Sequence, residues 1–206
     1  MVDHGLATLA RAEETLRAAT ELQERDPEGA EQTARSALAQ FRSAMNWLED
    51  TERFEDAHQR IDQAGAYVRR TFGCRLHQEG SAYEQRCPVA LAHNRIGFSP
   101  GMIIEESECS ICGSDPATCS HVTGRTYDGE FCARKITKAR ITEVSLVGRP
   151  AQPDARIERI SVDHTELRRH LGPGWVPGIP VSCDNCLTRC DGVSDPFAQP
   201  RGLRGH

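Results

Sequence analysis

Five residues whose side chains can bind metal ions lie close together near the middle of the chain. They are Cys109, Cys112, Cys119, His121 and Cys132. Cys109 and Cys112 are separated by two residues and followed by Gly113, so that two thiolates can bind one tetrahedral ion while the glycine lets backbone amides turn toward the sulfur atoms. We therefore predict a zinc site built from Cys109, Cys112 and two of the other three residues. The alternatives are buried reduced cysteines and a redox-active pair, but this pair does not open an apolar helix as a redox pair does.

A second group of cysteines lies near the end of the sequence. Cys183, Cys186 and Cys190 span eight residues. They lie inside a segment rich in glycine and proline, residues 172–206. So few apolar residues can hardly order this segment by burial alone, so we predict that a second zinc ion holds it. An iron–sulfur cluster and a flexible reduced tail are the alternatives. The candidates for the fourth ligand are Cys74, Cys87, His93, His164 and His170.

Cys74 and Cys87 lie on either side of a sequence that resembles a hairpin, with the turn "QEGS" at its centre. They could bind a metal together with His77 or His93, or Cys87 could complete the C-terminal site. An isolated cysteine near strands is also often a small apolar core residue. The two main clusters supply most of the eight ligands of two closed tetrahedral sites, so we expect about two zinc ions per chain.

Three amphipathic helices are expected in the first part of the chain, residues 1–72. Apolar residues recur there at three- and four-residue steps, which is the period of a helix with one buried face. The most regular stripe consists of Ala34, Ala37, Leu38, Phe41, Met45 and Leu48. Asp26 and Pro27 suit the start of the second helix, as cap and first helical residue. We predict a small antiparallel three-helix bundle.

After Phe72 the composition changes, and short runs with strand character appear between turn residues. They include "VALAH", "RIGFS", "GMIIE", "ARITEVSLV" and "ARIERISV". Asp163 and Glu166 suit the start of a short helix. The predicted fold class is α+β: an N-terminal helical bundle (residues 1–72), a zinc-stabilised β-rich domain (73–171) and a zinc-anchored C-terminal segment (172–206).

Charge and hydropathy exclude several classes of protein. The net charge is −5 with 27% charged residues, whereas a chain that binds nucleic acid over its whole surface is basic. No segment approaches the roughly 20 apolar residues of a membrane span, and the N-terminus resembles neither a secretory signal nor a transit peptide. Nine cysteines without such a signal point to a reducing compartment, so we expect a cytoplasmic protein with thiols that bind metal.

One segment resembles a known family. "ITEVSLVGRPAQPDARI" (Ile141 to Ile157) is similar to the strand and Pro-Ala turn of the tailed-phage prohead maturation proteases, and "IGFSPGM" (Ile96 to Met102) is more loosely similar to their serine-bearing strand. Those enzymes are serine proteases, so the resemblance implies a related β-rich scaffold. It also implies that Ser99 takes the place of the nucleophile and Glu143 that of the acidic residue.

The leading hypothesis is a non-enzymatic zinc-binding protein that contacts another protein, as a component of a larger assembly. No nucleotide-binding, metalloprotease, hydrolase or deaminase motif occurs in the chain. The first alternative is a zinc module that binds nucleic acid weakly, through the basic run "ARKITKARI". The second is a serine hydrolase of the prohead-protease type.

Overall fold

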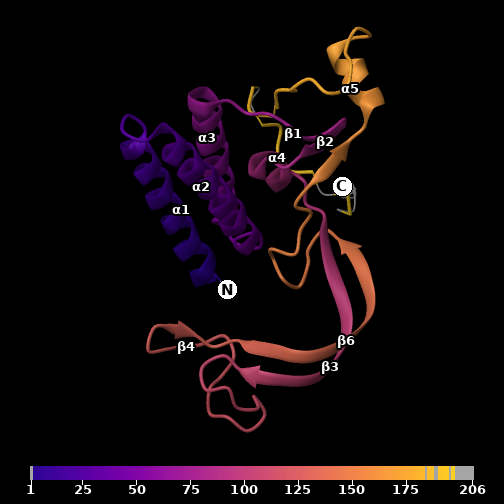
Figure 1. Cartoon of the computed structure of the whole chain (residues 1–206). Coiled ribbons are helices and arrows are strands. Elements are labelled where there is room, and N and C mark those ends of the chain that lie inside the picture. Colours follow the sequence, from indigo (N-terminus) through magenta and orange to yellow (C-terminus); the bar gives the residue numbers. More distant parts are fainter. Residues whose placement is uncertain (1, 184, 188–189, 195, 198–206) are drawn as a thin grey trace, which may run out of the picture. The chain divides into compact units, whose positions relative to one another are not determined.

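A computed structural model describes residues 2–183, 185–187, 190–194 and 196–197. It has three N-terminal helices followed by a region rich in strands, which confirms the predicted α+β class (Figure 1). The contacts divide the described chain into two compact units, one of Phe98–Val147 and one that combines the segments before and after it. These limits do not coincide with the boundaries predicted after residues 72 and 171.

The helices α1 (Val2–Leu22), α2 (Pro27–Trp47) and α3 (Phe54–Phe72) form where the sequence predicts them. Asp26 caps α2, and its carboxylate accepts a hydrogen bond from the backbone N–H of Gly29 (3.0 Å). The apolar stripes face one another and form the main core. Its larger side chains are those of Leu9, Leu38, Phe41, Met45, Leu48, Ile61 and Val68.

A fourth helix, α4 (Pro88–His93), packs on this core through Val89 and Ala92. The sequence "VALAH" predicts a strand, and that prediction is wrong. Pro88 takes the first helical position, where its missing N–H leaves no intrahelical partner unsatisfied. Two buried apolar residues three positions apart then fit one face of a helical turn.

A small antiparallel sheet lies in the same unit. It consists of β1 (His77–Glu79), β2 (Ala82–Gln85) and β7 (Ile160–Val162), in the order β1-β2-β7. The helix α5 (His164–Leu171) follows β7, and Asp163 caps it by accepting hydrogen bonds from the N–H groups of Thr165 and Glu166. The predicted cap is therefore confirmed.

The chain after α5 contributes to a second, smaller core. Trp175 and Val181 are buried there with Tyr83 and Leu167. The hydroxyl of Tyr83 donates to the carbonyl of Ile179 (2.8 Å) and accepts from the N–H of Gly178 (2.7 Å). Burial and hydrogen bonds thus hold residues 175–181, which the sequence analysis did not expect of a segment with so few apolar residues.

A buried polar network holds the return segment after Gly148 on the bundle. Glu49 accepts a hydrogen bond from Arg95 Nε (2.9 Å) and also pairs with Arg156, and both arginine side chains are almost fully buried. Asp154 accepts hydrogen bonds from three side chains of α2, those of Ser43, Asn46 and Trp47. This network explains how a chain that leaves the unit at Gly97 rejoins it fifty residues later.

The second unit is built on a two-stranded ribbon. The long strands β3 (Gly97–Cys109) and β6 (Arg134–Val147) pair with each other, and Figure 1 shows them running in opposite directions. Between these two strands in the sequence, β4 (Thr126–Tyr127) and β5 (Glu130–Phe131) form a short hairpin. No described helix in either unit is both long and apolar enough to cross a membrane.

Candidate metal centres

The first candidate centre lies at the end of the ribbon, where β3 leads into a tight turn. Cys109 is the last residue of β3 and its backbone N–H donates to the carbonyl of Ser114 (2.8 Å), while the N–H of Gly113 donates to Cys109 O (2.8 Å). Gly113 has a φ of 71°, a conformation that a residue with a Cβ rarely adopts. The turn therefore brings the thiols of Cys109 and Cys112 together, as the spacing predicts.

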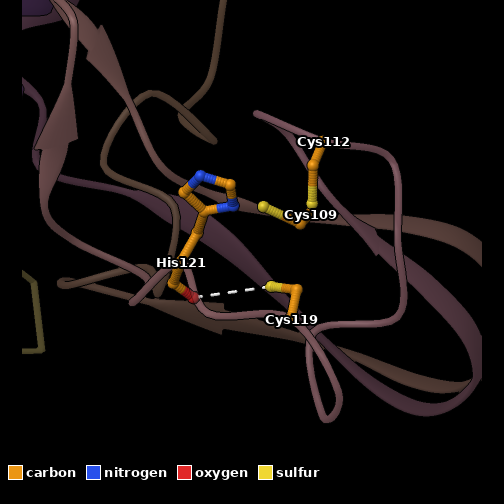
Figure 2. Close-up of side chains that lie close together, drawn as sticks. All are labelled: Cys109, Cys112, Cys119 and His121. Carbon is orange, nitrogen blue, oxygen red and sulfur yellow. Dashed lines mark hydrogen bonds between the residues drawn. The ribbon is translucent and has the colours of Figure 1, made fainter.

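Cys119 and His121 come from the loop after this turn and complete a group of four. The ligand atoms of Cys109, Cys112, Cys119 and His121 all lie within 4.8 Å of one another. Figure 2 shows the imidazole edge directed toward the thiols. The ring packs edge-on against Tyr127, and its buried Nδ1 has no hydrogen-bond partner. Such a nitrogen is costly to bury unless it binds a proton donor or a metal.

Cys132 lies beside this group but outside it. It follows β5, is almost fully buried, and its sulfur lies 3.8 Å from that of Cys109. Spacing alone leaves open which two of Cys119, His121 and Cys132 complete the site. The geometry groups the first two with Cys109 and Cys112 and gives Cys132 a neighbouring position.

Backbone amides prepare two of the thiols for metal binding. The N–H of Cys112 is the main cause that lowers the pKa of Cys109 to about 7, and the N–H and hydroxyl of Ser114 lower the pKa of Cys112. Burial, by contrast, raises the pKa of Cys119 and of Cys132. Zinc binds the thiolate form, so the first two cysteines lose a proton at the smallest cost.

The second candidate centre lies in the other unit and combines three elements. His58 and Asp62 are one helical turn apart on α3, His93 ends α4, and Cys190 belongs to the C-terminal segment. The Nε2 atoms of the two histidines are 3.1 Å apart, and Cys190 Sγ lies 3.3 Å from that of His58. Asp62 approaches both rings, at 3.2 Å from His93 Nε2 and 3.6 Å from His58 Nε2.

The outer nitrogens of the two rings already have partners. His93 Nδ1 lies 2.6 Å from the carbonyl oxygen of Val89, and His58 Nδ1 lies 3.5 Å from a carboxylate oxygen of Glu55. When each Nδ1 carries the proton, the two Nε2 lone pairs face each other and need a cation between them. A proton can serve as that cation, since hydrogen bonding to Asp62 raises the pKa of His93. A metal ion can do so equally well, with Asp62 and Cys190 as further ligands.

This centre borders a cavity of about 720 Å³, which all four residues line. The sequence predicts His93 and Cys190 as ligands but not His58 or Asp62. Their spacing of four residues, which places both on one face of a helix, was the available signal. Charged pairs at that spacing are common on exposed helices, so the signal is weak.

The predicted C-terminal cluster is divided in the structure. Cys190 lies with the two histidines, whereas Cys183 and Cys186 do not belong to that group of four. His164 and His170, considered as fourth ligands, lie on α5 and contact the carbonyl oxygens of Ser81 and Glu166. Neither belongs to either group of four described above.

Ser99 and Glu143, the residues that the resemblance marks as nucleophile and acid, lie on β3 and β6. Glu143 packs against Gly101, so closely that a Cβ there would lie 2.6 Å from its Cγ. Among the residues that the structure describes, no hydrogen bond joins Ser99 to a histidine.

Comparison of the chain with protein families, with curated proteins and with solved structures found no match.

Proposed function

We propose that this chain is a non-enzymatic zinc-binding protein that serves as a component of a larger protein assembly. The observation that carries the proposal is the pair of four-residue groups whose ligand atoms lie within 4.8 Å of one another. Nitrogen and sulfur ligands in tetrahedral sets favour zinc over magnesium or calcium, which prefer oxygen. Four protein ligands also close a tetrahedral site, whereas a catalytic zinc keeps one position open.

The ribbon β3–β6 supports a role in assembly. The described residues of its unit form no helix, and large apolar side chains of β6 are exposed: Ile141 is 63% exposed, Val144 62% and Leu146 57%. Side chains alternate along a strand, so Ile141 lies on one face of the ribbon and Val144 and Leu146 on the other. A two-stranded ribbon is at best marginally stable alone in water, and burial of these exposed side chains against a partner would stabilise it.

The partner that we propose for the ribbon is another copy of this chain. The ribbon carries acidic residues on β3 (Glu105, Glu106 and Glu108) and basic residues on β6 (Arg134, Lys135, Lys138 and Arg140). Lys135 and Lys138 pair with Glu108 and Glu105 of the same chain, so a contact between copies would exchange these pairs for pairs between the acidic strand of one copy and the basic strand of the next. Such head-to-tail contacts between unlike surfaces generate extended assemblies.

Sedimentation velocity of the zinc-loaded chain tests this proposal. We expect association that rises with concentration and is lost in the double variant Ile141→Glu/Val144→Glu. Leu171→Glu, which changes an equally exposed apolar residue on α5, should leave association intact. A chain that stays monomeric at all concentrations, or that contains no zinc when purified, contradicts the proposal.

Weak binding of nucleic acid is the second candidate function, because four basic residues of β6 are exposed. Two of them already form ion pairs with acidic residues of β3, Lys135 with Glu108 (2.8 Å) and Lys138 with Glu105 (3.1 Å). These pairs reduce the positive potential along the strand. Any affinity for DNA or RNA should therefore be weak and fall steeply with salt, which a binding titration at two salt concentrations measures.

A further inference from the structure

Four cysteines that belong to neither candidate centre converge in the first unit. Cys74 and Cys87 lie at the two ends of the hairpin β1–β2, and Cys183 and Cys186 are separated by two residues in the C-terminal segment. We propose that Cys74, Cys87, Cys183 and Cys186 bind one zinc ion as a structural tetrathiolate site. This site adds to the two groups described above and does not depend on them.

The backbone places Cys74 and Cys183 side by side. Residues 74–76 and 181–183 form a short antiparallel pairing: Arg75 bridges to Ser182, and the N–H of Leu76 donates to the carbonyl of Val181 (2.9 Å). The N–H of Cys183 donates to the carbonyl of Cys74 (3.0 Å). Cys74 and Cys183 are therefore directly opposite, and opposite side chains of an antiparallel pair lie on the same face, about 5 Å apart at Cβ.

Cys87 joins them from the start of α4. Its thiol and that of Cys183 hydrogen bond to each other, and this contact raises the pKa of Cys87. Gln85 connects the same two residues: its Nε2 donates to Cys183 Sγ (3.3 Å) and its Oε1 accepts from the N–H of Cys87 (2.9 Å). The N–H groups of Val89 and Ala90, in the first turn of α4, also approach the sulfur of Cys87. Amide donors of this kind accompany zinc-bound thiolates.

Cys186 completes the set from the opposite side. A Cβ on Gly65 would lie 3.1 Å from its sulfur, so the thiol packs directly against α3. The same Cβ would lie 2.6 Å from Cγ2 of Val89, so Cys186 and the first turn of α4, which follows Cys87, meet at one point of α3. One of the four cysteines is buried and three are partly buried, and as thiolates they would repel one another; a zinc ion removes that repulsion by binding all four.

The arrangement also explains the spacing of the C-terminal cysteines. Cys183 lies opposite Cys74 and Cys186 packs against α3, while Cys190, four residues after Cys186, reaches His58. The C-terminal segment is then attached to the bundle twice, by a tetrathiolate and by the mixed His–Asp–Cys centre. With the first centre in the ribbon unit, the chain would bind about three zinc ions instead of the two expected from the sequence.

Zinc content, measured by emission spectroscopy on variants that each remove one metal site, tests the proposal. The wild-type chain should contain about three equivalents, and the double variant Cys74→Ser/Cys87→Ser should lose one. Cys109→Ser/Cys112→Ser should lose a different equivalent, so a failure of the ribbon centre and a failure of this one are distinguishable. A double variant that keeps the full wild-type zinc content overturns the proposal.

A second measurement covers the case in which the double variant does not fold. In the cobalt-substituted wild-type chain, thiolate-to-cobalt charge transfer grows with the number of Co–S bonds, and three sites that include a tetrathiolate give about twice the absorbance of the two mixed sites alone. Alkylation of the unfolded chain without reductant should modify all nine cysteines. A disulfide between Cys87 and Cys183, or absorbance that two mixed sites account for, overturns the proposal.

Discussion

At the scale of single residues, His121 and Cys132 illustrate what distinguishes a ligand from a neighbour. Both are close to Cys109, but His121 has a buried ring nitrogen without a partner, whereas the thiol of Cys132 is in contact with another thiol. A thiol tolerates an apolar environment because it is a weak donor. An imidazole nitrogen does not, and the loss of its partner carries a desolvation cost.

This difference predicts unequal effects of two similar substitutions. Cys119→Ala should remove the zinc ion of the ribbon unit, because only three of the four grouped ligands remain. Cys132→Ala should retain that ion and destabilise the chain by about 1–2 kcal/mol through a small cavity. Zinc content and urea unfolding of the two variants measure both effects. If Cys132→Ala loses zinc and Cys119→Ala keeps it, then Cys132 is the ligand and Cys119 is the neighbour.

At the scale of elements, Glu49 is a carboxylate that pairs with two buried arginines, Arg95 after α4 and Arg156 in the return segment. Glu49→Ala should destabilise the first unit by about 3–5 kcal/mol, because Arg95 and Arg156 each lose a charged partner in a buried environment. The matched control is Asp50→Ala, since Asp50 pairs with Arg149 at the exposed surface. That change should cost less than about 1 kcal/mol. Equal effects in chemical denaturation would contradict this account.

Close packing of α3 on α4 gives a second prediction about elements. Gly65→Ala should destabilise the chain by about 1–2 kcal/mol, because the added Cβ would lie 2.6 Å from Cγ2 of Val89, and overpacking outweighs the gain of about 1 kcal/mol in helix propensity. Gly174→Ala is the control, since no atom lies within 4 Å of a Cβ at that position. Thermal unfolding of both variants measures the difference. A stabilised Gly65→Ala variant would contradict this account and show that α4 shifts to make room for the added Cβ.

The elements also show how far the sequence could predict this fold. The stripes containing Phe41 and Ile61 predict α2 and α3 because the helical period is a local property that the sequence records directly. The helix α4 has only six residues, too few for a period to be recognised. The contacts of Asp62 with His93 and of Cys190 with His58 join residues far apart in sequence, so spacing gave no indication of them. The Cys109–Cys112 pair was predictable because both ligands lie in one turn.

At the scale of the whole molecule, the first unit is discontinuous in sequence, and its C-terminal part is held by few apolar contacts. Among the described residues, the main core formed by the bundle and α4 has sixteen buried residues, whereas the second core has four. The described residues after Val181 contribute the three C-terminal cysteines. Metal binding therefore carries a larger share of the stabilising free energy in this segment than in the bundle.

Removal of metal should accordingly release the C-terminal segment before the bundle unfolds. After chelation, limited proteolysis should cut after Val181 at an early time, while sites near residue 60 in α3 stay protected by the buried side chains of Ile61 and Ala64. Mass spectrometry of the fragments gives the order of cleavage, and the untreated chain is the control. Restoring zinc should slow the early cuts again, because an ion that binds only the folded state stabilises it in proportion to its occupancy. If α3 is cut first, or if chelation leaves the cleavage pattern unchanged, the bundle and the C-terminal segment are not stabilised separately, and metal does not hold the latter.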